Sequence, residues 1–346
     1  MLALVYKSAW DVALEERPVP EIKKDNDVLV RIRATGVCGT DLGIISGKYH
    51  AVPSTILGHE SAGDVIAVGS AVSSLQPGDR VVIDPTYYCG QCEMCRTGRQ
   101  NHCTHKAVTE TGVSADGTFT DYYVTEDRFL YKLKDHISYE EATLTEPLSC
   151  MLTGINQINL LPNFTTVILG AGPIGILYSY ALASKGVTGC LVDISEERLA
   201  IADSIAPERW SAHATLESAI HELAPLKNQV DMIVDTTGVV GTEVLSQLAS
   251  GGYLRADDFE ATVNYLFRIK RTYPISQPID SLGTFSTAHY LIEQQIIPAK
   301  KIITHSYPLD DYHEAFKTLG CNISERTLQP SSQAIKIVLQ SNGSGN

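Results

Sequence analysis

The chain has 346 residues, a length that predicts two domains, each large enough to bury its own hydrophobic core. Hydrophobic residues make up 44% of the chain and charged residues 19%, which is typical of a folded globular protein and unlike a disordered or coiled-coil chain. Acidic residues outnumber basic residues 40 to 27, for a formal net charge of −13, so nucleic acid and anionic membranes are poor partners. The N-terminus lacks the layout of a signal peptide, and we expect a cytoplasmic protein.

The first part of the chain, to about residue 150, contains short predicted strands separated by Gly and Pro. Alternating apolar residues predict a half-buried strand at 28–34, and a Pro-Gly-Asp turn precedes a second predicted strand at 80–83. This pattern is typical of a compact antiparallel β domain.

After residue 147 the pattern changes to strands that alternate with helices. Strands are predicted at 167–169, 189–193 and 230–235, with one helix that ends near residue 185 and another at 196–205. Such alternation predicts a parallel, doubly wound sheet, so the fold class is α/β. Two helices, at 287–295 and 310–318, and a strand at 334–339 complete the chain.

A glycine-rich motif lies where the strand at 167–169 gives way to a helix. It comprises Gly170, Gly172, Pro173, Ile174 and Gly175. The motif alone is weak, because many turns need glycine, but Asp193 at the end of the next strand could bind an adenosine ribose. Backbone N–H groups at the helix start would hold the pyrophosphate. Since Asp193 would repel a 2′-phosphate, the motif predicts NAD rather than NADP.

Four of the eight cysteines lie close together, at Cys89, Cys92, Cys95 and Cys103. In a reducing compartment such a group indicates metal rather than disulfides. Seven residues separate the third and fourth cysteines and Thr104 follows, which does not fit a bacterial-type iron–sulfur run. The acidic chain disfavours a nucleic-acid-binding zinc module. We therefore predict a closed, structural zinc site.

A second set of possible metal ligands is dispersed along the chain. Cys38, the pair His59-Glu60, and Glu146 all lie in short segments that contain Gly or Pro. Sulfur, imidazole and carboxylate form the donor set of an open catalytic zinc site. Each residue also has an ordinary interpretation, as a buried thiol, a core histidine or a surface carboxylate. The residues alone leave both interpretations open.

Three motifs in this order resemble the zinc-dependent medium-chain alcohol dehydrogenases over nearly the whole chain. They are Gly58-His-Glu-x-x-Gly63, the four-cysteine segment and the glycine-rich motif. Glu146-Pro-Leu is similar to the polyol (sorbitol) dehydrogenase branch, and galactitol-phosphate and threonine dehydrogenases look similar at this level. The resemblance implies a GroES-like catalytic domain, residues 1–150 and 281–346, and a Rossmann domain, residues 151–280.

The resemblance also implies roles for individual residues. Cys38 and His59 match zinc ligands, Thr40 matches the hydroxyl that takes the substrate proton, and Gly238 joins the cofactor-binding residues. Phe119 resembles a residue that lines the substrate pocket. The third protein ligand is left open among Glu60, Glu146 and Cys150. We prefer Glu146, as a ligand or as a partner of a water on the metal, because Pro147 biases it towards an extended conformation.

The implied activity is reversible, NAD-dependent oxidation of a secondary alcohol of a polyol, sugar or cyclitol to a ketone, in a homo-dimer or homo-tetramer with two zinc ions per chain. Two features depart from the family. Gly43 stands where many relatives have a histidine that passes the proton to solvent, and the segment 253–260 differs from the usual apolar strand and turn. The alternative is a catalytically impaired dinucleotide-binding scaffold or sensor.

Overall fold

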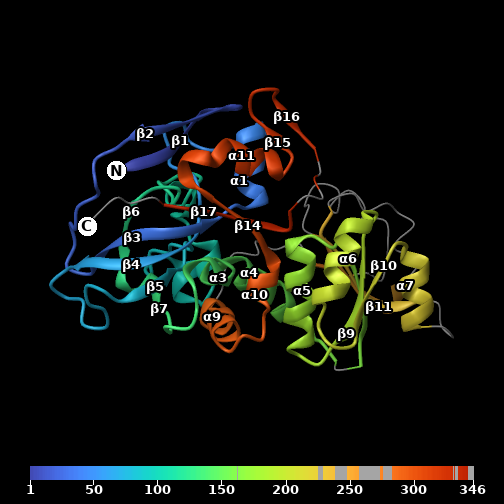
Figure 1. The fold of residues 1–346 in the computed structure, drawn as a ribbon. Coiled ribbons are helices and arrows are strands. Elements are labelled where there is room, and N and C mark those ends of the chain that lie inside the picture. Colours follow the sequence, from blue (N-terminus) through green and yellow to red (C-terminus); the bar gives the residue numbers. More distant parts are fainter. Residues whose placement is uncertain are drawn as a thin grey trace. The chain divides into compact units, whose positions relative to one another are not determined.

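The computed structural model describes residues 1–161, 163–224, 229–237, 248–256, 273–275, 283–329, 331 and 334–341 (Figure 1). The chain divides into two compact units. The first unit comprises Met1–Ser149 and Asp280–Asn346, and the second comprises Cys150–Ile279. Both ends of the chain therefore contribute to the first unit.

The first unit is built on a largely antiparallel sheet with the order β14-β17-β3-β4-β5-β7, in which β6 also pairs with β3. The strands are β3 (Asp27–Gly36), β4 (Glu60–Val68), β5 (Arg80–Ile83), β6 (Tyr122–Glu126), β7 (Leu130–Lys132), β14 (Ile303–Pro308) and β17 (Lys336–Gln340). Two smaller antiparallel pairs join β1 (Leu2–Ser8) to β2 (Asp11–Glu16) and β15 (Cys321–Asn322) to β16 (Thr327–Leu328). The predicted antiparallel β domain is confirmed. The parallel pairing of β14 with β17 was not predicted.

The core of the first unit follows from the alternation read in the sequence. Val28, Val30 and Ile32 of β3 are buried and pack in one cluster with Val81 and Ile83 of β5. Fully burying each such side chain contributes about 1.5–3 kcal/mol. This packing fixes β3, whose end leads into the first part of the candidate site.

Short helices surround this sheet, and one of them corrects an expectation. They are α1 (Gly39–Ser46), α2 (Glu93–Arg96), α3 (Tyr139–Thr143), α9 (Phe285–Glu293), α10 (Ala299–Ile302) and α11 (Tyr312–Thr318). The described residues also form 3₁₀ turns at Gln100–His102, Lys106–Val108, Asp127–Phe129 and Leu309–Asp311. The extended conformation expected for Glu146 is wrong, since helix α4 spans Thr145–Asn156 and carries Glu146 in its first turn. Proline is tolerated there because the first N–H groups of a helix have no partner within it.

The second unit contains a six-stranded parallel sheet with the order β10-β9-β8-β11-β12-β13. The strands are β8 (Thr165–Leu169), β9 (Thr188–Val192), β10 (Trp210–His213), β11 (Val230–Asp235), β12 (Leu248–Ala256) and β13 (Tyr273–Ile275), and the helices are α5 (Pro173–Ala183), α6 (Glu196–Ile205) and α7 (Leu216–Leu223). The predicted doubly wound sheet is confirmed. Strand order reverses between β8 and β11, the kind of point at which open α/β sheets bind ligands.

Within the described residues, no helix is both long enough and apolar enough to cross a bilayer.

Candidate functional site

Strand register brings the first group of candidate ligands together. In the antiparallel pairing of β3 with β4, Gly36 lies opposite Glu60. Cys38 follows the end of β3 and His59 precedes β4, so both lie at the same edge of the sheet. One ligand atom each from Cys38, His59 and Glu60 lie within 4.8 Å of one another. The structure thus assembles a sulfur, an imidazole and a carboxylate that are separated in sequence.

The start of helix α1 positions the thiol of this group. Cys38 is the N-cap, and its backbone N–H donates to Oδ2 of Asp41 at 2.9 Å. The Cys38 Sγ lies 3.6 Å from Oγ1 of Thr40. The hydroxyl expected to take the substrate proton is therefore next to the sulfur expected to hold the metal.

Asp41 is a site residue that the sequence reading did not single out. Its side chain is fully buried, and Oδ1 lies 3.8 Å from Nδ1 of His59. A carboxylate facing one ring nitrogen orients an imidazole for metal binding through the other. The signal was its place in Cys-Gly-Thr-Asp, three residues after Cys38.

Lys336 is the second such residue. Its Nζ forms an ion pair with Oε2 of Glu60, and both side chains are almost completely buried. Lysine and glutamate are rarely buried unless they are paired. The available signal was a lone lysine inside the apolar run Ala334-Ile-Lys-Ile-Val-Leu339.

The electrostatics of this group favour a bound cation. Burial opposes protonation of His59, but the neighbouring Asp41, Cys38 and Glu146 together raise its pKa well above the usual range. Oδ1 of Asp41 and Oε1 of Glu60 are buried without a hydrogen-bond partner. A site that attracts a proton to His59 attracts a metal cation for the same reason. The donor set and the unsatisfied oxygens fit zinc.

Among the described residues, Glu146, the preferred third ligand from sequence, is not one of those whose ligand atoms lie within 4.8 Å of one another at this site. Its charge nevertheless contributes to the raised pKa of both His59 and Lys336. Of the two glutamates, Glu60 is the one with a carboxylate oxygen within 4.8 Å of ligand atoms of Cys38 and His59.

Two further expected features can be placed in the first unit. A Cβ at Gly43 would lie 2.2 Å from Cδ2 of Tyr49, so the Tyr49 ring fills the space that a side chain at position 43 would need. Phe119, expected to line the substrate pocket, is 1% exposed and packs in a core cluster with Leu57 and Phe316. The structure places Phe119 in the core of the first unit.

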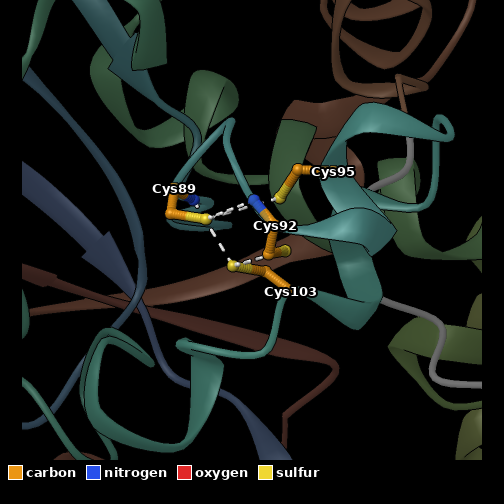
Figure 2. Close-up of side chains that lie close together, drawn as sticks. All are labelled: Cys89, Cys92, Cys95 and Cys103. Atoms are coloured by element: carbon orange, nitrogen blue, oxygen red, sulfur yellow. Dashed lines mark hydrogen bonds between the residues drawn. The ribbon is translucent and has the colours of Figure 1, made fainter.

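The four-cysteine group has the geometry of a closed metal site (Figure 2). The sulfurs of Cys89, Cys92, Cys95 and Cys103 lie within 4.8 Å of one another, and Cys89–Cys95 and Cys92–Cys103 are each 4.0 Å apart. Four sulfurs about 2.3 Å from a tetrahedral zinc would lie about 3.8 Å apart. Backbone N–H groups, those of Thr104 and Cys95 foremost, lower the pKa of Cys92 to about 5, whereas burial raises the pKa of Cys95 to about 12. A bound metal would supply the positive charge that deprotonates Cys95.

In the second unit, the glycine-rich motif forms the turn from β8 into α5. Gly172 is the N-cap of α5, and a Cβ there would meet open space. A Cβ at Gly175 would lie 1.9 Å from the carbonyl oxygen of Gly170, so only glycine lets the helix pack so closely on the turn. Pro173 is the first helical residue and is followed by Ile174, leaving N–H groups at the helix start directed outwards.

The Asp193 carboxylate fixes this turn through hydrogen bonds with the backbone. Its Oδ2 accepts a hydrogen bond from the N–H of Ala171 at 2.8 Å, and its Oδ1 accepts one from the N–H of Ser195 at 2.9 Å. Nη1 of Arg198 lies 3.8 Å from Oδ2. Gly238 and residues 257–260, which carried two of the expectations, lie outside the described residues.

Comparisons with known proteins identify the family of this chain. The family model described as "Alcohol dehydrogenase GroES-like domain" matches residues 24–135. Probable D-xylulose reductase A of Emericella nidulans is 32% identical over 345 residues, which cover 94% of this chain and 95% of the relative. This chain belongs to the zinc-dependent medium-chain alcohol dehydrogenases. D-xylulose reductase A of Aspergillus oryzae is 31% identical to this dehydrogenase over 353 residues. The alignment covers 94% of this chain and 96% of the relative.

Solved structures share the fold of this dehydrogenase. An oxidoreductase/dehydrogenase of unknown specificity from Escherichia coli matches with a TM-score of 0.83 and 26% identity, covering 99% of both chains. Galactitol-1-phosphate dehydrogenase from Escherichia coli matches with a TM-score of 0.80 and 24% identity, covering 98% of this chain and 100% of its own. The protein is therefore an oxidoreductase with zinc and a nicotinamide dinucleotide as cofactors, and a non-catalytic scaffold is not favoured.

Proposed function

We propose that this dehydrogenase interconverts a secondary alcohol of a polyol and the corresponding ketone with NAD, and that a five-carbon ketose such as D-xylulose is among its substrates. The observation that carries the proposal is the group formed by Cys38, His59 and Glu60, with the Thr40 hydroxyl beside it. The choice of ketose is supported by the names of the relatives that match nearly the whole chain.

The residues of the site have distinct tasks. Cys38 and His59 would hold the zinc, and Asp41 orients the His59 ring. Bound zinc would supply Lewis-acid polarisation of the substrate oxygen, and bound NAD would supply the hydride acceptor. Thr40 would accept a hydrogen bond from the substrate hydroxyl and relay its proton, giving up its own hydroxyl proton as it takes the new one. Beyond Thr40 the proton needs a route without a histidine at position 43, because the Tyr49 ring occupies that space.

The second unit holds the coenzyme. N–H groups at the start of α5 bind the pyrophosphate, and the Asp193 carboxylate binds the adenosine ribose. Ile194, next to Asp193, is 98% exposed and offers an apolar surface to the adenine ring. Asp193 also disfavours a 2′-phosphate, so NAD is preferred over NADP.

The deciding experiment is an NADH-absorbance assay of the zinc-loaded enzyme over xylitol, other polyols, phosphorylated hexitols and simple secondary alcohols, with D-xylulose in the reverse direction. We expect turnover of polyols and of D-xylulose, and a His59→Ala variant should lose it. Turnover of simple alcohols alone would overturn the polyol assignment. If protein of full zinc content turned over none of these alcohols, the proposed dehydrogenase activity would be overturned.

A matched variant tests the coenzyme preference. Asp193→Asn keeps an acceptor for one of the two backbone N–H groups but removes the charge that repels a 2′-phosphate. We expect the NAD-to-NADP ratio of kcat/KM to fall by about tenfold or more, since one repulsive contact is worth about 1.4 kcal/mol or more. A wild-type enzyme that uses NADP better would contradict the role given to Asp193.

We also propose a homo-dimer or homo-tetramer in the cytoplasm, on the strength of the family resemblance. Light scattering coupled to gel filtration would measure the mass in solution. A monomer at micromolar concentration would contradict the proposed assembly.

A further inference from the structure

A third group of metal-ligand residues lies in the second unit, on the predicted strand β9 and on two elements that the sequence did not predict, β10 and α7. Cys190 lies on β9, Ser211 and His213 lie on β10, and Glu222 lies on α7. The parallel register places Ser211 opposite Cys190 and His213 opposite Val192, so these polar side chains share one face of the sheet. Helix α7 packs on that face, as shown by the Cys190 Sγ, which lies 3.9 Å from the Ala219 carbonyl oxygen.

Three different donor atoms converge there. A sulfur of Cys190, a ring nitrogen of His213 and a carboxylate oxygen of Glu222 lie within 4.8 Å of one another. Nε2 of His213 is 3.0 Å from Oε2 of Glu222. Ligand atoms of a tetrahedral zinc lie about 3.3–3.8 Å from one another, so small side-chain movements would close the set around an ion.

The hydroxyl of Ser211 lies in the middle of the group. Its Oγ is 3.2 Å from Cys190 Sγ, 3.2 Å from His213 Nε2 and 2.8 Å from Glu222 Oε1. The Ser211 hydroxyl therefore contacts one atom of each of the three side chains, and it would turn aside for a metal ion that binds between them. Cys190 is fully buried, whereas the Glu222 side chain is 54% exposed, so the group opens to solvent on one side.

We propose that Cys190, His213 and Glu222 form a further zinc site in the coenzyme unit, in addition to the four-cysteine site and the site at Cys38. The zinc displaces the thiol proton of Cys190, which passes to the solvent, and is bound by one sulfur, one nitrogen and one carboxylate oxygen. Such a donor set suits zinc, whereas oxygen ligands alone would suit magnesium or calcium.

A hydrogen-bond network alone accounts for less of the group. Such a network would use a hydroxyl at position 190 better than a thiol, because a thiol is a weak donor and acceptor. A bound zinc ion gives the sulfur a function that the network does not.

The site would also stabilise the part of the unit that faces the coenzyme. The N–H of Asp193 donates to the carbonyl oxygen of His213 at 3.2 Å, so a metal that holds His213 also holds the strand end beside Asp193. A ligand that binds only the folded state raises the unfolding temperature. Zinc binding is therefore measurable without any assay of turnover.

The test compares zinc content after dialysis of the full-length enzyme against buffer with micromolar free zinc. Cys190→Ser retains a hydrogen-bonding side chain and removes the soft ligand. We expect wild type to contain about one zinc per chain more than Cys190→Ser or His213→Ala. Added zinc should raise the unfolding temperature of wild type more than that of Cys190→Ser.

Matched controls are present in the same chain. Cys321→Ser changes another fully buried cysteine, and His221→Ala changes an exposed histidine on α7; both should keep the wild-type zinc content. If Cys190→Ser does not fold, Glu222→Gln replaces an exposed carboxylate and should lower occupancy. Equal zinc content in wild type and in the folded variants would overturn the proposal, whatever the enzyme's substrate proves to be.

Discussion

The ammonium of Lys336 and the carboxylate of Glu60 form an ion pair across strand β3, with 5% and 1% of their side chains exposed. β17 and β4 flank β3, and the residue between the two side chains is Gly36. A Cβ at Gly36 would lie 2.2 Å from Oε2 of Glu60 and 3.1 Å from Cε of Lys336. Glycine at this position is therefore what allows the pair to form over the backbone of β3.

Removing the lysine should destabilise the protein strongly. Lys336→Met keeps most of the buried length of the side chain but leaves the Glu60 carboxylate without its counter-charge. We expect the free energy of unfolding to fall by about 3–5 kcal/mol, measured by urea denaturation of the metal-free protein. The double variant Lys336→Met with Glu60→Gln should recover part of that loss.

An exposed pair serves as control. Lys317 and Glu314 lie 3.7 Å apart, and both side chains are more than half exposed. Lys317→Met should cost less than about 1 kcal/mol. An equal decrease in the free energy of unfolding for Lys336→Met and Lys317→Met would contradict the strong destabilisation expected from breaking the buried pair.

Asp84, just after β5, should make stability fall as pH rises. Burial raises the pKa of its carboxyl to about 7, against hydrogen bonds from Thr86 that lower it. Between the ordinary pKa near 4 and about pH 7, the folded state binds more protons than the unfolded state, so this group's contribution declines with increasing pH. Asp84→Asn should remove that decline and be more stable than wild type at about pH 8, by roughly 1–3 kcal/mol.

The measurement is the unfolding free energy of wild type and Asp84→Asn at several pH values from about 4 to 8. Asp203→Asn, at an exposed helix position, should leave the wild-type pH profile unchanged. Parallel profiles for wild type and Asp84→Asn would exclude a raised pKa at Asp84.

The sequence predicted those parts of the sites that lie in short, contiguous motifs. The four clustered cysteines could be found because their spacing is local, whereas Cys38 and the pair His59-Glu60 are dispersed and were assigned through the resemblance to a family. Lys336 could not be found, because its contact with Glu60 depends on β17 pairing with β3, a long-range relationship. Its single positive charge within an apolar strand was an isolated signal without a partner.

Other differences have equally specific causes. The proline after Glu146 suggested extended backbone, but the first turn of a helix accommodates proline, and α4 begins at Thr145. β10 was not predicted because it has only four residues, Trp-Ser-Ala-His, without a clear apolar alternation. Helix α7 was not predicted either. The Cys190 group was consequently out of reach of the sequence reading.

The two zinc sites of the first unit should be separable by mutation. Cys92→Ser removes one of four thiolates from a closed site and should lower both zinc content and the unfolding free energy, the latter by several kcal/mol. His59→Ala should lose a different zinc, together with turnover, and should lower the unfolding temperature less than Cys92→Ser does. Zinc content by elemental analysis and calorimetry would check both. An iron–sulfur absorption band, or activity loss without zinc loss in His59→Ala, would contradict these assignments.

The relative weight of two carboxylates can be measured directly. Glu60 lies in one group with Cys38 and His59 and is paired with Lys336, whereas Glu146 acts on His59 and Lys336 through its charge. If Glu146 binds the metal or a water on it in the zinc-loaded enzyme, Glu146→Gln should lower zinc affinity or turnover by about 10–100-fold. Glu60→Gln should lower turnover and also stability, because it leaves the buried Lys336 ammonium unpaired. Zinc dialysis, steady-state kinetics and urea denaturation on both variants separate these effects. A Glu146→Gln variant with unchanged zinc affinity and turnover would make Glu60 the third protein ligand and would remove the main sequence support for the polyol branch.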